Sequence, residues 1–470
     1  MMRPRPVRID VGLLVRLGLP VVLPVVLLVG LLLAPGRVRA AGGGSPPTLG
    51  NEAAMSGGAV VAAGRGGSMA WYNPAGLGAN RRGRLEASAQ LFMIRVRRID
   101  RGLSLDLPDG AHGSQIRSRE LLVLPSATIW VIKVAPRTNL ALSLFVPTFD
   151  EVDIDTFAQR RFTPIEYAQQ IKVLYQQRRY DVGPSLGFQP FPSLRLGVGA
   201  FVVYEKTAQS SRAWAWGNAP AQGVQRFVLA DVSESVRSWG TEFVAGLQWQ
   251  PTEYLHLGLA VRSPRLWFVQ TTSRSSVAAS GGHNPTRGEY GELAFEPNLR
   301  SGLRRPNDPT TVTAGLAYQW RKGQVAIEGD ISPARSGGED RGQKASWALR
   351  LGMRARLSPR FTLGAGLYTQ RSAAVLADDF LEFDLDTYGA TLGAELRRPV
   401  QLGARERARR LVFTTTVALR YTVSIGRAGP MRIDLADLSD EAREVLIESG
   451  TPVAARVYDL ALSLGSGLEF

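Results

Sequence analysis

Few side chains in this chain have the type and spacing needed for catalysis. The sequence has three histidines, His112, His256 and His283, and no cysteine. The histidines lack metal-site spacing, and without cysteine there can be neither a thiolate zinc site nor a cysteine nucleophile. The segment GPSLG (183–187) matches G-x-S-x-G, but it lies between two predicted strands rather than in a strand-turn-helix unit. We therefore predict no enzyme activity, no catalytic residue, no metal and no cofactor; a surface lipase with a Ser–His pair is the enzyme alternative.

Arginine is the chemically active residue type that remains. The formal net charge is +15, but the arginines are scattered rather than gathered in runs with interleaved aromatic residues, so we do not predict nucleic-acid binding. Several fall on one face of predicted strands: Arg95, Arg195, Arg262, Arg350, Arg354, Arg356 and Arg420. Arg262, Arg350 and Arg354 are our candidates for binding the carboxylate of a ligand. The alternative is ion pairing inside the protein, for example with Glu328 and Asp330 on a neighbouring strand.

The elements that position these arginines are strands. Segments such as LVFTTTVALRYTV (411–423) and WALRLGMRARL (347–357) alternate apolar with small, polar or charged residues, which is the period of a β-strand. We predict fourteen strands, near 84–97, 117–134, 138–149, 176–190, 194–208, 232–250, 254–272, 308–321, 324–335, 343–358, 360–373, 381–397, 410–426 and 455–470.

The connections between these strands favour a membrane barrel over a soluble sandwich. Short links such as 135–138, 190–193, 251–254 and 321–323 alternate with long ones at 150–175, 209–231, 273–307 and 427–454. Short periplasmic turns, long outer loops and an even strand number are typical of outer-membrane barrels. The sequence therefore predicts an all-β fold, a 14-stranded antiparallel transmembrane β-barrel over 84–470. Trp214 and Trp216, in one predicted outer loop, are candidates for an apolar ligand-capture groove.

Both ends of the sequence agree with export to the outer membrane. Residues 1–40 combine a basic start, an apolar run interrupted by proline, and small residues before Ala41, which predicts a signal peptide. The last predicted strand ends in Phe470, with alternate apolar residues before it. We interpret this aromatic residue as a signal for the outer-membrane assembly machinery.

Residues 41–83 do not have a strand pattern. They are small, turn-rich and apolar, and they include AWYNPAGL (70–77), in which Asn73-Pro74 favours a turn directly after two aromatic residues. An apolar segment before the first strand of a barrel fits best inside that barrel.

This region resembles the FadL family of outer-membrane transporters for long-chain fatty acids and other hydrophobic compounds. The resemblance rests on AWYNPAGL, SGGAVVAA (56–63), LSLFVPTFD (142–150), LGLAVRSP (257–264) and PTTVTAGLAYQW (309–320). It implies an N-terminal hatch over 41–83, with Trp71, Tyr72, Asn73, Pro74, Ala75 and Gly76 as its gating residues.

The resemblance also implies a mechanism and a set of partners. A hydrophobic ligand would enter from outside and leave sideways into the membrane at a kink in the third strand, for which Pro147 and Thr148 are candidates. The expected partners are this ligand, outer-membrane lipid and the assembly machinery, and the expected state is a monomer. A general or anion-selective porin and a non-transporting structural or secretion-associated barrel are the alternatives.

Overall fold

The computed structural model describes most of the chain that follows the predicted signal peptide. The described residues are 48–107, 110–162, 165–219, 224–284, 288–302, 309–335, 343–376, 382–402, 409–434, 447–449 and 451–470. The predicted signal peptide, 1–40, lies outside them.

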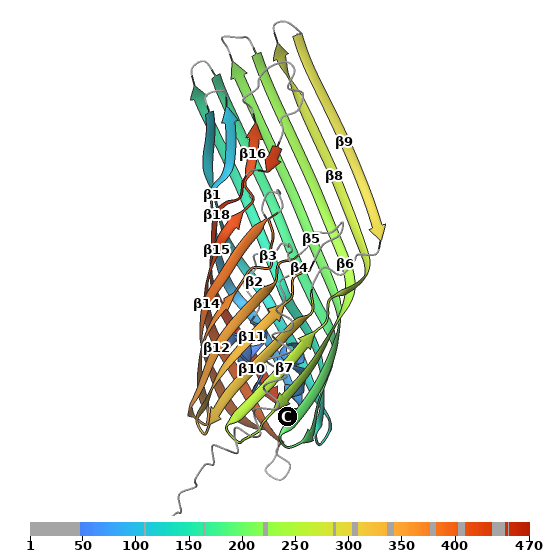
Figure 1. Cartoon of the computed structure of the whole chain (residues 1–470), viewed down its shortest axis with the longest axis vertical. Coiled ribbons are helices and arrows are strands. Elements are labelled where there is room, and N and C mark those ends of the chain that lie inside the picture. The colour runs from blue at the N-terminus through green and yellow to red at the C-terminus, as the bar shows by residue number, and fades with distance from the viewer. Residues whose placement is uncertain are drawn as a thin grey trace, which may run out of the picture.

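Fourteen antiparallel strands close into a barrel (Figure 1). Each pairs with the next, and the last strand, β18, returns to the first along a register that joins Arg84 to Glu469 and Ile99 to Ala455. The predicted fold class is confirmed. The barrel strands are β1 (Arg84–Leu107), β2 (Gly110–Ala135), β3 (Thr138–Phe162), β4 (Ile165–Phe191), β5 (Leu194–Ala219), β6 (Val224–Trp249), β7 (Leu255–Arg262), β10 (Thr311–Trp320), β11 (Gly323–Ser332), β12 (Ser346–Ser358), β13 (Phe361–Gln370), β14 (Phe383–Leu402), β15 (Arg409–Ala428) and β18 (Val453–Glu469).

Several strands continue far beyond the closed part of the barrel. Strands β1 to β6 contain 24 to 27 residues each, whereas about 10 residues suffice to cross a membrane. A further hairpin, β8 (Leu266–Asn284) and β9 (Gly288–Gly302), lines up along the outer half of β6, and the short strands β16 (Met431–Asp434) and β17 (Ile447–Ser449) lie beside β1. In Figure 1 these strands form a tilted sheet at the end opposite to the C-terminus.

The predicted outer loops at 150–175, 209–231 and 273–307 are therefore wrong for most of their length. Strands β3, β4, β5, β6, β8 and β9 cover these ranges, and Trp214 and Trp216 lie within β5. The predicted short turns are confirmed at Pro136–Arg137, Pro192–Ser193 and Arg321–Lys322. These outer parts of the strands were not predicted because polar residues interrupt their apolar alternation. Pairing with neighbouring strands satisfies their backbone hydrogen bonds even where the side chains are not buried.

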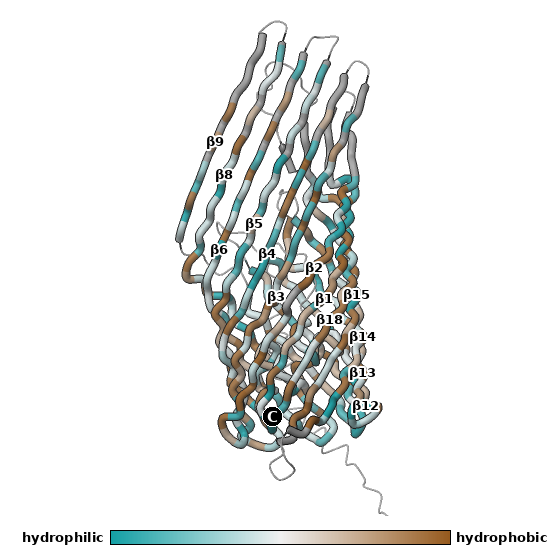
Figure 2. The backbone as a smooth tube through the Cα atoms, turned by 180° about the vertical axis from the view of Figure 1, so that it is seen from behind, coloured by the Kyte–Doolittle hydropathy of each residue, from teal (hydrophilic) through white to brown (hydrophobic). Residues whose placement is uncertain are grey.

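The outer face of the closed barrel is apolar. Large apolar side chains are exposed on this face, and they include Val182, Phe243, Leu351 and Leu392. Figure 2 shows the hydropathy changing along the strands. Aromatic rings border this surface. Tyr254, Tyr318 and Trp320 stack at the short-turn end, and Tyr180, Tyr204 and Trp239 lie together farther out. An apolar band between aromatic girdles is the surface of a barrel that spans an outer membrane.

The residues before β1 form a compact group of short elements. Helices α2 (Asn51–Met55) and α3 (Met69–Tyr72) and the 3₁₀ helix η1 (Pro74–Ala79) lie in residues 48–83, here named the N-terminal segment. This segment contacts the inward faces of strands all around the barrel, from β4 and β5 through β7 and β13 to β18. Among the described residues, no helix is both long and apolar enough to cross a membrane.

Among the described residues, the backbone ladder of the barrel wall ends early between β2 and β3. β2 pairs with β3 only between Ala127↔Phe145 and Ala135↔Thr138. Farther out, β2 stays paired with β1 and β3 stays paired with β4, and the β3–β4 register shifts between Phe145 and Thr148. This shift falls in the stretch between Phe145 and Thr148, which contains Pro147. A role of Pro147 and Thr148 in ligand exit stays a prediction.

Candidate functional site

The turn at Asn73 and Pro74 fixes the N-terminal segment to the wall. Pro74 occupies the first turn of η1, where its missing N–H costs nothing, and the Asn73 side chain accepts a hydrogen bond from Ala75 N at 3.2 Å. The same side chain donates to Val61 O at 2.9 Å and to Leu247 O of β6 at 3.0 Å. One asparagine thus caps a helix and holds two separate stretches of backbone.

Glycines in the wall let this turn come close. A Cβ atom at Gly246 would lie 1.9 Å from Oδ1 of Asn73, and one at Gly197 would lie 2.2 Å from the carbonyl carbon of Pro74. Glycine inside a strand often marks such a close approach of another backbone. The wall is therefore shaped to the N-terminal segment at these positions.

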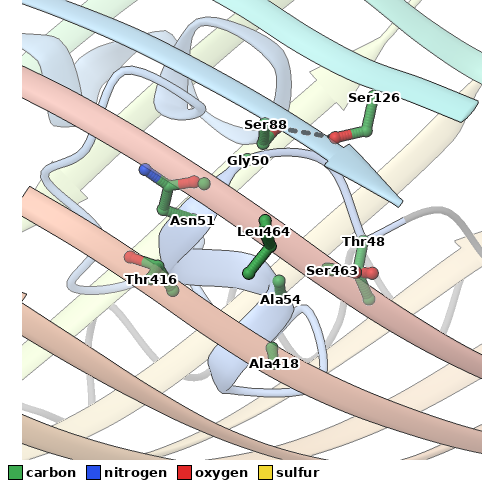
Figure 3. Close-up of a pocket in the computed structure, with 11 residues that line it drawn as sticks. Thr48, Gly50, Asn51, Ala54, Ser88, Ser126, Thr416, Ala418, Ser463 and Leu464 are labelled. Carbon is green, nitrogen blue, oxygen red and sulfur yellow. Dashed lines mark hydrogen bonds between the residues drawn. The ribbon is translucent and has the colours of Figure 1, made fainter. Parts of the chain in front are cut away.

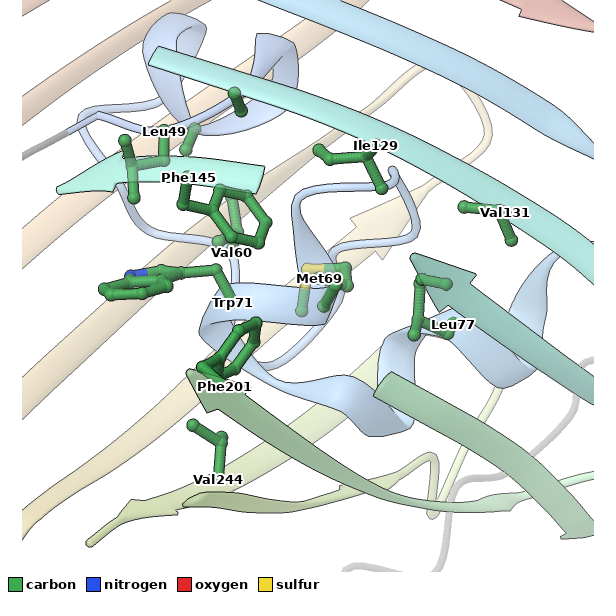
Figure 4. Close-up of a cluster of buried hydrophobic side chains, with 14 residues drawn as sticks. Leu49, Val60, Met69, Trp71, Leu77, Ile129, Val131, Phe145, Phe201 and Val244 are labelled. Carbon is green, nitrogen blue, oxygen red and sulfur yellow. The ribbon is translucent and has the colours of Figure 1, made fainter. Parts of the chain in front are cut away.

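Trp71 packs into a cluster of buried hydrophobic side chains on one side of the N-terminal segment (Figure 4). Its indole lies 5.4 Å from the ring of Phe145 on β3 and 5.8 Å from that of Phe201 on β5, measured between centroids. It is only 8% exposed. The remaining large side chains of this buried cluster are Leu49, Val60, Met69, Leu77, Ile129, Val131 and Val244. Tilted aromatic contacts of this kind add to the gain from burial alone.

Arginines complete the surroundings of Trp71. The Arg262 guanidinium lies 3.9 Å from the centroid of the indole and also donates to Trp71 O at 2.5 Å. Arg262 forms an ion pair with the buried Glu242. Arg179 lies 5.5 Å from the same ring and pairs with Glu242 and Asp181, each at 2.6 Å. The indole is thus fixed by a cation–π contact and by a charged network of the wall.

Two other wall arginines form ion pairs next to the N-terminal segment. Arg350 donates to Glu328 at 3.0 Å, and Glu328 in turn accepts hydrogen bonds from Val60 N at 2.9 Å and Val61 N at 2.8 Å. Arg354 pairs with Glu52 of the segment itself. These carboxylates satisfy backbone N–H groups that have no helix or sheet partner.

The buried acids and phenols of the N-terminal segment have shifted pKa values. Burial opposes ionisation of Glu52, but Arg354 and the N–H groups of Gly66 and Arg65 together hold its pKa below the usual value. Burial raises the pKa of Tyr72 to about 12, so this phenol stays neutral, and its oxygen accepts a hydrogen bond from Leu49 N at 3.0 Å.

The opposite side of the N-terminal segment meets the wall through polar groups. A cavity of about 10 Å³ lies there, lined by Thr48, Gly50, Asn51, Ala54, Ser88, Ser126, Thr416, Ala418, Ser463, Leu464 and Gly465 (Figure 3). Oδ1 of Asn51 and Oγ1 of Thr416 are buried without a hydrogen-bond partner among the described residues. A cavity of this size holds roughly one water molecule, which would satisfy both oxygens.

At the break, β3 bends toward the barrel interior. Phe149 packs against Met93 of β1, Leu122 of β2 and Ala461 of β18, all of which are inward-facing, buried residues. The next residue, Asp150, pairs with both Arg95 and Arg97 of β1. β3 therefore passes behind the edge of β2 instead of pairing with it.

A charged layer holds β3 in this position. Arg95 also binds Asp459 of β18 at 2.7 Å, and Arg97 binds Glu120 of β2 at 2.6 Å. Arg97 donates further to Glu151 O at 2.5 Å, which replaces a ladder hydrogen bond that β3 has lost. The two arginines connect four strands across the break.

Beyond this charged layer, on the side away from the N-terminal segment, apolar side chains fill the barrel interior. Ile99 of β1 is 1% exposed and belongs to a buried cluster contributed by seven strands. Its other members are Ile116, Val152, Ile154, Ile171, Val173, Leu385, Ala428, Ala455 and Val457. From its outer end to its short-turn end, the barrel interior thus holds an apolar cluster, a charged layer and the N-terminal segment.

The structure brings together only some of the predicted site residues. Trp71, Asn73 and Arg262 meet at one place, and the kink candidates Pro147 and Thr148 lie just beyond Phe145. Arg350 and Arg354 lie beneath the same segment, and all three candidate arginines are ion-paired, as the alternative interpretation held. Trp214 lies apart, near Phe157 on the strand extension. Ligand contact by any of them, and gating by residues 71–76, remain predictions.

Three residues that complete the site were not predicted from the sequence. Phe145, Phe201 and Asp150 were not singled out, although Phe145 and Asp150 lie within the segment that carried the kink candidates. The glycines of β5 and β6 were a usable signal, because glycine in strand interiors indicates an approaching backbone. Among the described residues, no group of three or more histidine or acidic side chains could hold a metal.

Comparison with known proteins identifies the fold. No protein-family profile matches the sequence, and no curated protein matches it. Among solved structures, a Pseudomonas aeruginosa FadL homologue is 14% identical with a TM-score of 0.51, and 92% of this chain and 99% of that chain are covered. The toluene transporter TodX of P. putida is 14% identical with a TM-score of 0.52, and 90% of this chain and 99% of that chain are covered. The toluene transporter TbuX of Ralstonia pickettii is 12% identical with a TM-score of 0.51, and 91% of this chain and 98% of that chain are covered. The chain shares the barrel fold of these proteins over most of its length.

Proposed function

We propose that this protein transports hydrophobic small molecules across the bacterial outer membrane and releases them sideways, between β2 and β3. The contact between Trp71 and Phe145 carries this proposal. Phe145 is the last residue of β3 that pairs with β2, so a side chain of the N-terminal segment rests on the point where the wall opens. A movement of the segment would therefore act directly on β3.

The layers of the barrel interior fit the transfer of an apolar solute. Apolar surface that leaves water gains about 25 cal/mol per Å², and the buried cluster around Ile99 supplies apolar side chains near the outer end of the barrel. Backbone groups facing lipid need hydrogen-bond partners. The donation from Arg97 to Glu151 O supplies one on the displaced strand.

Among hydrophobic solutes, the ion pairs of the three candidate arginines favour a neutral compound over a fatty acid. Arg262, Arg350 and Arg354 each already have a carboxylate partner. A fatty-acid carboxylate would have to displace one of these buried acids, and leaving a buried charge unpaired is expensive. Two of the solved structures with this fold are named as toluene transporters, which supports a small aromatic compound as the first solute to test.

The two alternative functions make different demands on the interior. An open porin needs a water-filled path, whereas the N-terminal segment packs against strands around the whole barrel. This packing supports a gated transporter over a porin. A purely structural barrel would have no need for a break in the ladder beside the segment.

A cross-link across the break tests the exit route, because the natural chain has no cysteine. Leu122→Cys with Phe149→Cys would place thiols in one cluster on either side of the break. Leu316→Cys with Ile327→Cys is the matched control, since these residues are direct partners in the intact β10–β11 ladder.

Uptake of radiolabelled toluene and of a long-chain fatty acid into proteoliposomes is then measured, with and without a short thiol cross-linker. We expect cross-linking at the break to stop uptake, reduction to restore it, and the control pair to have no effect. Uptake that continues after complete cross-linking would disprove sideways release. Saturable fatty-acid uptake without toluene uptake would establish the second candidate solute.

A further inference from the structure

The outer surface carries two rows of cationic side chains that the transport proposal does not use. In the first row, Arg178 of β4 lies opposite Lys206 of β5, which lies opposite Arg237 of β6. Lys206 and Arg237 point outward, because side chains alternate along a strand and the neighbouring Ser238 of β6 and Glu205 of β5 are buried. Arg178 is only partly exposed, and its guanidinium lies 4.9 Å from the ring centroid of Phe149 on β3. Three positive charges thus lie side by side on adjacent strands.

The first row lies directly beyond an aromatic girdle. Two residues nearer the closed barrel on the same strands are Tyr180, Tyr204 and Trp239, which are also direct partners in register. Their ring centroids lie 6.3 Å and 4.7 Å apart. Stacked aromatic residues mark the boundary between hydrocarbon and headgroups, so the cations lie at the level of the headgroups.

A second row lies on the other side of the break. Arg98 of β1 is the direct partner of Arg456 on β18 and of Arg117 on β2, and all three side chains are exposed. The apolar surface ends just below them with Ile94, which is 49% exposed. The two rows therefore lie on either side of the place where β2 and β3 separate.

Among the described residues, the protein supplies only part of the negative charge that would neutralise these rows. Like charges directly opposite one another destabilise a sheet. Asp100 forms an ion pair with Arg98 at 3.0 Å and also interacts electrostatically with Arg456. Among the described residues, this acid lies beside the second row, where three cations are direct neighbours. An anion placed between neighbouring cations would turn repulsion into attraction.

We propose that the two rows bind phosphate groups of anionic lipids in the outer leaflet. Arginine forms paired hydrogen bonds with phosphate oxygens, and the adjoining apolar band would hold the acyl chains of the same lipid. A free phosphate ion would meet only the cations, whereas a lipid gains from both surfaces. Bound lipids would line the outer edges of β2 and β4, next to the break in the wall.

The test compares lipid binding by variants that remove equal numbers of cations. Arg98→Gln, Arg117→Gln and Arg456→Gln remove the second row, and Arg178→Gln, Lys206→Gln and Arg237→Gln remove the first. The matched control is Arg321→Gln, Lys322→Gln and Arg360→Gln, three exposed cations at the short-turn end. Binding of fluorescent phosphatidylglycerol and phosphatidylcholine is measured on the full chain in neutral detergent, with inorganic phosphate as competitor.

We expect the preference for phosphatidylglycerol to fall by about fivefold for each cation removed from a row, and to weaken as salt increases. The control variant should keep the preference, and inorganic phosphate should compete poorly. The proposal would be overturned if the row variants kept the natural preference for phosphatidylglycerol. It would also be overturned if the control variant lost as much of that preference as the row variants. Full competition by inorganic phosphate would show a site for free phosphate and would also reject a lipid site.

Two further measurements separate this proposal from misfolding and from failed transport. Thermal unfolding in detergent without lipid must give the row variants at least the stability of the natural protein, because removing like charges relieves repulsion. Toluene uptake, measured on the same variants, reports on transport alone. Loss of lipid preference with normal uptake would support the lipid sites whatever the outcome for the exit route.

Discussion

The indole of Trp71 and the ring of Phe145 meet at 5.4 Å between centroids, inclined by 53°, and so join the N-terminal segment to the last residue of β3 that pairs with β2. A residue of the first described elements therefore contacts the wall at the place where β2 and β3 separate. The contact lies within a dry, buried cluster, so any change in it affects both parts.

Replacing Trp71 by alanine should loosen the N-terminal segment. The variant removes contacts with Phe145, Phe201 and the Arg262 guanidinium, and the loss of a buried tryptophan costs about 3–5 kcal/mol. We expect a lower unfolding temperature and frequent channel openings in planar bilayers. Trp214→Ala, which changes a tryptophan on the strand extension, should leave conductance unchanged. A closed, stable Trp71→Ala barrel would contradict the anchoring role.

A single methyl group at Gly246 should displace the segment from the wall. Its Cβ would lie 1.9 Å from Oδ1 of Asn73, so the turn at Asn73 must move. Overpacking of this kind typically costs about 1–3 kcal/mol. Gly217→Ala is the matched control, because nothing lies within 4 Å of its added Cβ. Hydrogen exchange of residues 60–76 should become faster in Gly246→Ala and stay unchanged in Gly217→Ala.

Neutralising Asp150 should free β3 near the break. In Asp150→Asn, Arg95 keeps Asp459 and Arg97 keeps Glu120, so the barrel should remain folded. The link between β3 and β1 weakens, and we expect faster toluene uptake into proteoliposomes.

Asp330→Asn is the control for this change. It also removes one of two acids that an arginine contacts, because Arg350 keeps Glu328 at 3.0 Å. Equal effects on uptake in both variants would mean that loss of any such charge is enough to change uptake. In that case β3 would have no special role.

Acid should loosen the N-terminal segment through Glu52. The pKa of Glu52 is held below its usual 4.5, so its ionised form stabilises the fold fully above pH 4.5. This contribution disappears as the pH falls through the lower folded pKa. Channel openings should therefore become more frequent in acid than at neutral pH.

Glu52→Gln should remove most of this dependence on acid by opening the channel at neutral pH as well. Glu253→Gln changes an exposed acid in the turn before β7 and should keep the natural response. The same response to acid in all three proteins would assign it to groups other than Glu52.

Much of the barrel could be predicted because its signal is local. Alternation in segments such as 411–423 places one face toward lipid and the other inward, and each closed-barrel strand repeats that pattern. The extended parts of β3 to β6 could not be predicted in this way. Their alternation is weakened by polar residues on both faces, and their strand structure depends on pairing with equally long neighbours.

The candidate site was predictable only in part. Trp71, Asn73 and Pro74 stand in one short segment whose turn chemistry is visible in the sequence, and Pro147 is incompatible with a regular ladder. Their partners are far away in the chain: Arg262 lies 191 residues from Trp71, and Leu247 lies 174 residues from Asn73. Only closure of the barrel brings such residues together.

By itself, the sequence determined the strand period, the inward or outward direction of most barrel side chains, the turn at Asn73-Pro74 and the irregularity at Pro147. Each of these depends on steric and solvation preferences of neighbouring residues. The tertiary structure decided which inward arginines meet which carboxylates, where β3 parts from β2, and that Trp71 rests on Phe145. These depend on strand register and barrel closure, because contacts across the interior join residues whose separation in sequence carries no local signal.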